Sequence, residues 1–313
     1  ENVDGKFTDV TSSTVGSNQT EESISLAAPG MVTDAIFDDF DNDNDLDLVI
    51  VGEWMPITFF ENSNGKFDDV TKRYNPSAQR GWWYSISKGD FNGDGKSDYI
   101  VGNVGGNNKF HPSETKPLEI YVKDFDENGT EDIVLAKYQD NICYPVRGRQ
   151  CSSEQMPFIK NKFPTYGEYA TADIDNIYGQ EALDAALHYS AKNFHSVVLM
   201  SNDGGFEEQD LPIFAQLGPV NKSIVFDANN DGNMDVVTVG NNFSVEVETV
   251  RYDGGRGAVL LGDGKGNFEQ LSPLESGFFE NNDCKDMVRI EHDGSTMLIT
   301  VSNRNKAKTF LLN

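Results

Sequence analysis

The sequence predicts an all-β fold, a β-propeller of six blades, and three observations lead to this prediction. An acidic loop between two apolar runs occurs four times within 313 residues. A hairpin pattern, an apolar strand followed by an Asn/Asp/Gly turn and a phenylalanine, recurs out of phase with these loops. The two termini, joined end to start, complete one more copy of the hairpin, as expected where terminal strands close a ring.

Counting these patterns gives the blade number. The six predicted units are residues 33–72, 82–116, 117–149, 182–214, 220–274, and 285–313 together with 1–11. A seventh blade is an alternative if residues 14–31 or the middle of the chain contain further strands. An open sandwich is also compatible with many short strands, but it gives no reason for the split last unit. We therefore assign 1–313 to a single propeller domain whose last blade combines N- and C-terminal strands.

A small helical insert is expected near residues 153–179. Ser153 starts a short helix that should extend to Lys162, with a proline near its first turn. A capping box at 165–168 starts a second helix, which Gly179 can end. Asp173 and Asp175 are similar to a degenerate acidic loop, but they lack its other residues, so we assign them to this helix.

Charge and hydropathy exclude several classes of function. The chain has 25 Lys and Arg against 51 Asp and Glu, a formal net charge of -26. Such a surface repels phosphate backbones, which excludes nucleic acid as a partner, and it disfavours anionic membranes. No run of 18 apolar residues is present, so we expect no membrane insertion. The chain opens with polar residues in place of a signal peptide, which is typical of a mature or excised domain.

Three cysteines are present. Cys143 and Cys151 lie eight positions apart and either form a disulfide across a short loop or remain two reduced thiols. No Cys-x-x-Cys pair occurs, which argues against zinc ribbons and thioredoxin-like redox sites. Cys284 is left over and is expected to be a free thiol.

The four acidic loops have the composition of calcium sites. Each presents side-chain oxygens at positions 1, 3, 5 and 9, a main-chain carbonyl at position 7, and Gly or Asn at position 6, where a left-handed turn is expected. Calcium binds six to eight such oxygens in flexible geometry, whereas magnesium keeps more of its waters. The predicted ligands, loop by loop, are Asp39, Asp41, Asp43, Asp45, Asp47; Asp90, Asn92, Asp94, Lys96, Asp98; Asp124, Asp126, Asn128, Thr130, Asp132; and Asp227, Asn229, Asp231, Asn233, Asp235.

The EF-hand is the obvious alternative for these loops, and solvated turns are the plainer one. An EF-hand requires a glutamate at position 12, where this chain has apolar or β-branched residues of the following strand. Solvated turns would not require four copies of one spacing. We therefore expect about four Ca²⁺ ions in strand–loop–strand sites, with a structural role.

The loop at 90–98 followed by Tyr-Ile-Val-Gly resembles the FG-GAP/VCBS repeat, the calcium-bearing unit of integrin α-chain propellers. The stretches 143–158, 162–166 and 215–221 are similar to bacterial ASPIC/UnbV-type repeat proteins. The resemblance implies calcium-stabilised binding or adhesion on a secreted or bacterial cell-surface protein, in some cases beside outer-membrane importers. It also implies that this chain is the C-terminal propeller of a longer protein. It implies no known reaction.

No catalytic constellation emerges from the sequence, so we expect no enzyme. Gly-x-Ser-x-Gly and His-Glu-x-x-His are absent, and Gly95-Lys96-Ser97 lacks the first glycine of a phosphate loop. His188 and His195 are interpreted as packing residues of strands, with a shared metal or acid–base role as the alternative. Arg147 and Arg149 are interpreted as structural ion-pair partners in an acidic chain.

Three functions remain open from the sequence. The first is a calcium-stabilised extracellular scaffold that binds a protein or glycan. The second is a carbohydrate-active enzyme or lectin on the same fold, and the third is a purely structural module of a larger surface protein. Fold cannot decide among them, because function depends on the sites a fold carries.

Overall fold

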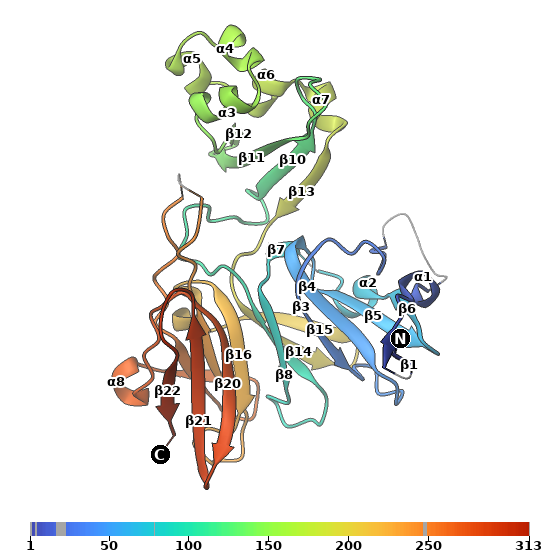
Figure 1. The fold of residues 1–313 in the computed structure, drawn as a ribbon, viewed down its shortest axis with the longest axis vertical. Coiled ribbons are helices and arrows are strands. Elements are labelled where there is room, and N and C mark those ends of the chain that lie inside the picture. Colours follow the sequence, from blue (N-terminus) through green and yellow to red (C-terminus); the bar gives the residue numbers. More distant parts are fainter. Residues whose placement is uncertain (1, 4, 17–22, 78, 247–248, 313) are drawn as a thin grey trace. The chain divides into compact units, whose positions relative to one another are not determined.

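The computed structural model describes residues 2–3, 5–16, 23–77, 79–246 and 249–312, and it is mostly β-structure in antiparallel sheets (Figure 1). The chain forms two compact units. The first, called the discontinuous unit, consists of 1–109 and 194–313; the second, called the inserted unit, consists of 110–193.

Four sheets of three to five strands build the discontinuous unit, together with a short two-stranded ribbon. In sheet order, the strands are β3 (Met31–Asp38), β4 (Asp47–Met55), β5 (Thr58–Ser63) and β6 (Lys66–Asp69), with β7 (Gly81–Trp82) paired to β4; β8 (Ser85–Gly89), β9 (Asp98–Gly102), β14 (Val197–Asn202) and β15 (Gly205–Asp210); β16 (Val220–Phe226), β17 (Asp235–Gly240), β18 (Ala258–Gly262) and β19 (Phe268–Leu271); β20 (Cys284–His292), β21 (Ser295–Ser302) and β22 (Lys308–Leu311); and the ribbon β1 (Asn2–Val3) and β2 (Lys6–Phe7). Its short helices are α1 (Thr11–Thr14), α2 (Thr71–Tyr74), η1 (Ile213–Gln216) and α8 (Pro273–Ser276).

These four sheets pack in chain order, because β3 contacts β8, β8 contacts β16, and β16 contacts β20. Inner strands such as β4, β9 and β17 are buried on both faces, which explains the nearly continuous apolar runs in their sequences. In β14, Val197 and Leu199 belong to the core against the first sheet, whereas Val198 and Met200 belong to the core against the third. Alternate side chains of β14 therefore pack into two separate hydrophobic cores, one on each face of its sheet.

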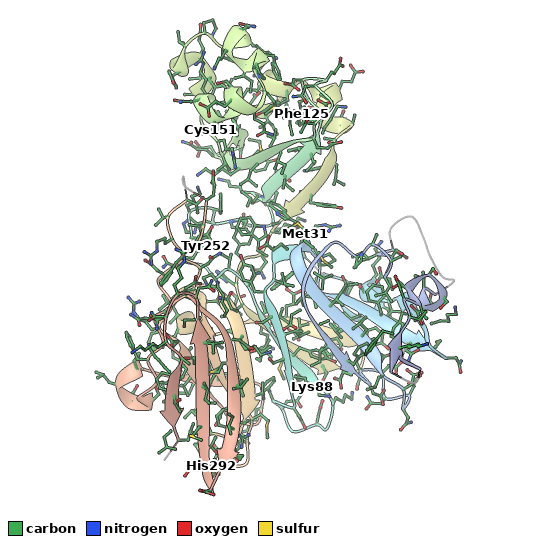
Figure 2. The ribbon with its side chains drawn as sticks, in the orientation of Figure 1. Met31, Lys88, Phe125, Cys151, Tyr252 and His292 are labelled. Carbon is green, nitrogen blue, oxygen red and sulfur yellow. The ribbon has the colours of Figure 1, made fainter. Side chains whose placement is uncertain are left out.

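Polar contacts also join neighbouring sheets. Asp38 of β3 is buried and accepts hydrogen bonds from Lys88 of β8 at 2.7 Å and from the Tyr99 hydroxyl of β9 at 2.7 Å. Figure 2 labels Lys88 among the side chains of the discontinuous unit. The hydroxyl of Ser85 donates to the Val220 carbonyl at 2.9 Å, which ties β8 to β16. Each of these buried polar groups has a partner, as burial requires.

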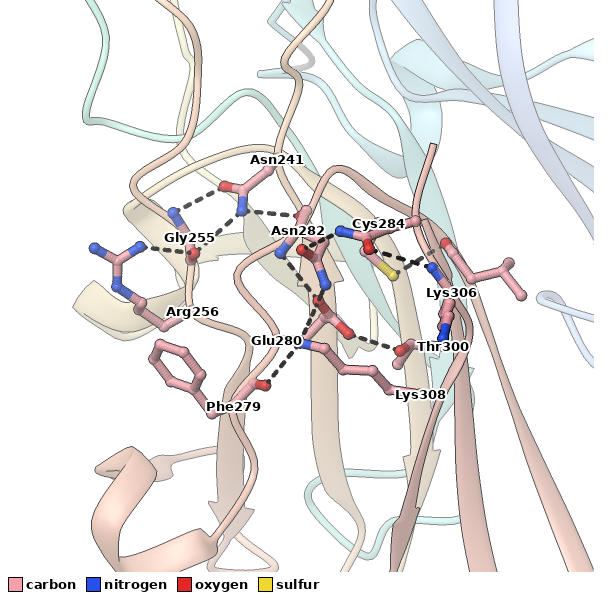
Figure 3. A network of polar contacts seen from close by, with 12 residues as sticks. Asn241, Gly255, Arg256, Phe279, Glu280, Asn282, Cys284, Thr300, Lys306 and Lys308 are labelled. Atoms are coloured by element: carbon pink, nitrogen blue, oxygen red, sulfur yellow. Dashed lines mark hydrogen bonds and ion pairs between the residues drawn. The ribbon is translucent and has the colours of Figure 1, made fainter. Parts of the chain in front are cut away.

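A buried network connects the third and fourth sheets (Figure 3). The Glu280 carboxylate is 1% exposed. It accepts from the Thr300 hydroxyl at 2.7 Å, from the Asn282 main-chain N–H at 3.0 Å and from the Lys308 ammonium at 3.1 Å. The Asn241 amide donates to the main-chain oxygens of Gly255 and Asn282, each at 3.1 Å. Sequence patterning did not indicate this network, because its members lie on separate loops and strands.

The inserted unit has one four-stranded sheet and a group of short helices. Its sheet order is β12 (Ile142–Pro145), β11 (Asp132–Gln139), β10 (Leu118–Lys123) and β13 (Leu187–Ala191). The helices are α3 (Arg149–Gln155), α4 (Phe158–Lys162), α5 (Tyr166–Ala170), α6 (Ile174–Tyr178) and α7 (Gln180–Asp184). Val134 and Ala136 of β11 pack against these helices, which gives the unit a hydrophobic core of its own.

The unit boundaries expected from the sequence are confirmed in part. Units 33–72 and 220–274 each match one sheet. Units 82–116 and 182–214 are not separate: β8 and β9 share one sheet with β14 and β15, and the inserted unit interrupts this sheet in the chain. The first strand of unit 182–214, at Leu187–Ala191, instead pairs with a strand of unit 117–149. The strand signals were correct, but the partner of β9 lies about ninety residues further along and is not its neighbour in sequence.

The expected closure of the last blade by both termini is wrong for the residues that the structure describes. β22 pairs with β21, and β1 pairs with β2 across the turn at Gly5. No described N-terminal strand enters the β20–β21–β22 sheet. The N-terminal hairpin signal is satisfied locally, because two strands separated by a tight turn can pair with each other without a distant partner.

The expected helical insert is present, but its helices have other bounds: α3 begins at Arg149, and the predicted start at Ser153 is wrong. Pro157 separates α3 from α4, since it lacks the N–H that would continue a helix. The capping box is confirmed: Thr165 accepts from the Glu168 N–H, and Glu168 accepts from the Thr165 N–H. Asp173 caps a new helix, so the single helix predicted up to Gly179 is divided into α5 and α6. Asp173 and Asp175 thus belong to helical structure, as predicted.

All three cysteines are free thiols. The disulfide alternative for Cys143 and Cys151 is therefore absent from this structure, and Cys284 is free as predicted. Burial raises the pKa of the Cys143 thiol to about 12 and of the Cys284 thiol to about 11. Such thiols remain protonated at neutral pH and are poor nucleophiles.

Replacement of Gly102 by alanine is expected to destabilise the discontinuous unit. A Cβ at this position would lie 2.1 Å from the Val220 carbonyl oxygen of the next sheet. Overpacking of this kind costs about 1–3 kcal/mol. Urea unfolding of G102A should show this loss, whereas G204A, whose Cβ would meet nothing closer than 3.6 Å, should unfold like the parent. Equal stability of G102A and parent would contradict the close packing of these sheets.

Glu280→Gln is expected to reduce stability at pH 7 by about 1–3 kcal/mol, because an amide cannot satisfy the same donors. Burial raises the pKa of Glu280, but bonds from Thr300, Asn282 and Lys308 outweigh it and leave the pKa below its usual value. This contribution is therefore present above the unfolded pKa and is lost as the pH falls through the folded pKa. Urea titrations at pH 7 and pH 3 should show the difference between parent and E280Q shrinking in acid; Glu269→Gln, at an exposed position, is the control.

Candidate metal sites

The four acidic loops each connect the first strand of a sheet segment to the next strand. They follow β3, β8, β10 and β16 and precede β4, β9, β11 and β17. Three lie in the discontinuous unit, and the loop at 124–132 lies in the inserted unit. The same loop therefore occurs in the same strand context in both units.

The first carboxylate organises every loop. In the second loop, Asp90 accepts from the main-chain N–H groups of Gly93 at 2.7 Å and Gly95 at 2.9 Å. Asp39, Asp124 and Asp227 likewise accept N–H bonds from the fifth and sixth positions of their loops. The side chain at position 5 in turn accepts from the N–H of position 7, for example Asp94 from Lys96 at 2.8 Å. The loop main chain is thus wrapped around its own carboxylates.

Left-handed backbone at two positions makes this wrapping possible. Position 6 has positive φ in all four loops, as predicted: Asn44 (75°), Gly95 (81°), Gly129 (88°) and Gly232 (91°). Position 4 is also left-handed: Asn42 (62°), Gly93 (75°), Glu127 (58°) and Asn230 (61°). Three of these four residues are Gly or Asn, which adopt this conformation readily, so the left-handed turn at position 4 could also have been predicted from the sequence.

The ninth position is the buried anchor of each loop. Asp47, Asp98, Asp132 and Asp235 are at most 2% exposed. One oxygen of each accepts the N–H of the second loop residue, between 2.8 and 3.2 Å. In the discontinuous unit, the other oxygen accepts an N–H from the third strand of the same sheet: Asn62, Ser201 and Gly262, at 2.7–2.8 Å. Sequence reasoning did not identify these three partners.

In the discontinuous unit, burial and neighbouring charge disfavour ionisation of the buried ninth aspartate. Burial raises the pKa of Asp47 to about 6, and the Asp41 and Asp45 charges add to the effect. Burial also raises the pKa of Asp98 and Asp235, against the hydrogen bonds that lower it. A cation beside such carboxylates would favour their charged form.

The oxygens of these loops suit a hard cation. One carboxylate oxygen each from Asp39, Asp41 and Asp43 lies within 4.8 Å of the others, and the same holds for Asp124, Asp126 and Asp132. The Oδ1 atoms of Asp45 and Asp126 are buried and have no hydrogen-bond partner among the described residues. Burial raises the pKa of Asp45, and the charges of Asp43, Asp41 and Asp39 raise it further. Clustered oxygens with unsatisfied lone pairs are the donor set that calcium prefers.

The second and fourth loops contain fewer carboxylates. Asn92 and Asn229 occupy their third position. In each, the side-chain oxygen accepts from the main-chain N–H of the position-5 aspartate, and the side-chain NH₂ donates to the carboxylate of that aspartate. At position 7, the Lys96 ammonium turns to Asp203 at 3.2 Å, an exposed pair outside the ligand set. The side chain at this position is therefore free to vary, while its carbonyl remains the predicted ligand.

The two histidines have separate partners. His188 stacks on Tyr121 with ring centroids 4.3 Å apart and lies 2.8 Å from Glu119. His195 lies 2.6 Å from Asp210. The interpretation as a strand-packing residue fits His188 of β13, but it is wrong for His195, which lies at a bend before β14. Arg149 binds main-chain carbonyls in place of the expected ion-pair partner.

A family match from the comparisons with known proteins covers the first two of these loops. The FG-GAP-like repeat family matches residues 39–101, a stretch that starts at the first residue of the first loop and ends just after the second loop. No curated protein matches the chain. Among the described residues, no helix is long and apolar enough to cross a membrane.

Asp98→Asn is expected to destabilise the discontinuous unit by about 1–3 kcal/mol, even without metal. The carboxylate accepts N–H bonds from Phe91 at 2.9 Å and from Ser201 at 2.7 Å, and an amide has only one oxygen to offer them. Chemical denaturation in EDTA measures this loss. Asp203→Asn, at a fully exposed side chain, is the matched control and should change stability by less than about 0.5 kcal/mol.

Proposed function

We propose that this chain is a calcium-stabilised, propeller-type binding scaffold of an extracellular or bacterial cell-surface protein. The observation that carries the proposal is the fourfold repetition of one oxygen-rich loop with the same internal hydrogen bonds and the same buried ninth carboxylate. Repeats of the FG-GAP-like family generally serve binding or adhesion and usually occur in extracellular proteins. The motifs at 143–158 and 215–221 support a relationship to ASPIC/UnbV-type proteins and, with it, an association with outer-membrane proteins.

Calcium has a structural role in this proposal. The carboxylates of the first loop repel one another, and burial raises the pKa of its ninth aspartate, Asp47. A divalent cation offsets both effects, and about four ions would reduce a net charge of -26 to about -18. Binding to the folded state alone at a free concentration about 100 times Kd stabilises it by about 2.7 kcal/mol per site. In this proposal, calcium stabilises the fold that carries the binding surfaces, and the residues that contact a protein or glycan partner are not calcium ligands.

Metal removal tests the proposal directly. Thermal unfolding in excess EDTA and in about 1 mM Ca²⁺, with the metal content of the same sample measured, should show a marked calcium-dependent rise in Tm and about four ions per chain. Asp90→Ala should lower the stoichiometry by one ion and reduce the rise in Tm. Glu269→Ala, which removes one exposed carboxylate outside the loops, should retain both. A Tm independent of calcium, with no bound metal, would refute the proposal.

A further inference from the structure

A hollow of about 540 Å³ lies in the inserted unit, between the β11–β12 hairpin, the segment 146–149 and helix α5. Its volume is in the range typical of ligand sites. Seven of its fifteen lining residues belong to the stretches 143–158 and 162–166, which lie outside the calcium loops. The residues used below are Lys137, Gln139, Tyr144, Arg149, Tyr166 and Thr171, all of which line it.

The walls of the hollow are tied together by hydrogen bonds within the unit. The Val146 N–H donates to the Leu135 carbonyl at 2.7 Å and holds the segment after β12 against β11. The Arg149 side chain donates to the carbonyls of Phe163 at 2.6 Å and Pro164 at 3.1 Å, which fixes the start of α3 to the turn before α5. The Tyr169 hydroxyl donates to Ser152 at 2.8 Å beneath this wall. The shape is therefore built into the fold.

Its charge is opposite to that of the chain. Three of the eight Lys and Arg residues of 110–193 line the hollow, but only one of the fourteen Asp and Glu residues does. In the part of the chain that the structure describes, Lys137 has no ion-pair partner, and Arg149 bonds to carbonyl oxygens and not to a carboxylate. The Arg149 guanidinium also interacts electrostatically with the Glu168 carboxylate, whereas the Lys137 ammonium keeps a charge that an anionic ligand can neutralise.

The remaining lining resembles a sugar-binding surface in its chemistry. Tyr166 is 61% exposed at the start of α5, and the Arg149 guanidinium lies 5.2 Å from its ring centroid. Tyrosine rings offer a flat apolar face to C–H groups, and the hydroxyl and amide of Thr171 and Gln139 can exchange hydrogen bonds with sugar hydroxyls. A bare anion would make no use of these groups.

We propose that this hollow binds a carboxylate-bearing saccharide, such as a uronic acid unit of a glycan. The carboxylate lies against Lys137 and Arg149, and the sugar ring contacts Tyr166 or Tyr144. This inference gives a ligand class to the binding role proposed above, but it depends on other residues than the calcium loops. The two can therefore fail separately.

The test uses the whole chain in saturating calcium and two probes that differ only in the carboxylate: methyl β-glucuronide and methyl β-glucoside. Ligand-observed NMR titration should show binding of the glucuronide, with the glucoside at least about tenfold weaker, and the affinity should fall with added salt. Absence of glucuronide binding up to about 10 mM, or equal binding of both sugars, would overturn the proposal. Acetate or inorganic phosphate competing as well as the glucuronide would overturn the saccharide part.

Variants locate the site. Lys137→Gln should weaken glucuronide binding about tenfold with little change in Tm, because the Lys137 main chain pairs within the sheet while its ammonium makes no hydrogen bond or ion pair among the described residues. Lys160→Gln removes the same charge from α4, outside the hollow, and should bind like the parent. Tyr166→Ala should weaken both sugars alike, since it removes the ring contact. Full affinity in K137Q would refute the assignment of the carboxylate, whatever the metal content of the protein.

Discussion

The structure depends on a buried aspartate at the end of each acidic loop. A carboxylate removed from water is costly unless its oxygens are hydrogen-bonded. In the discontinuous unit, Asp47, Asp98 and Asp235 meet this requirement with one N–H from their own loop and one from the third strand of their sheet. Each anchor thus fixes the loop, the strand that follows it and the strand beyond.

This constraint explains why two sequence patterns recur together. The acidic loop supplies the carboxylate, and the hairpin pattern supplies the N–H that donates to it. The donors Asn62, Ser201 and Gly262 all lie at or near the end of the third strand, just before its turn. In the sequence, the acidic loops and the hairpins are two separate repeating patterns with no visible connection. In the structure, one hydrogen bond joins them: its donor and acceptor are fifteen residues apart in the first sheet and 103 apart in the second.

The sequence separation of two interacting residues also determines whether their contact could be predicted from the sequence. The loops, their left-handed sixth positions and the strands on either side follow from short-range chemistry, and the sequence shows them directly. Which strands share a sheet does not: β14 carries the same local pattern whether it pairs with β9 or begins a blade of its own. An insertion of 84 residues between the two strands leaves every local signal intact while it changes the count of units. The prediction of a last blade closed by both termini failed for the same reason. The N-terminal hairpin pattern is equally compatible with two strands that pair only with each other, as β1 and β2 do.

The inserted unit shows the opposite case, in which the important arrangement has no periodic signal. The hollow depends on where β12, α3 and α5 meet, and Arg149 sets that meeting point through two main-chain carbonyls. Expecting an ion-pair partner for Arg149 was reasonable in a chain with 51 acidic residues. In the inserted unit, however, three of the eight Lys and Arg residues line the hollow, against one of the fourteen Asp and Glu residues. These cations come from β11 and from the segment after β12, so a local excess of positive charge arises in an acidic chain without any run of basic residues in the sequence.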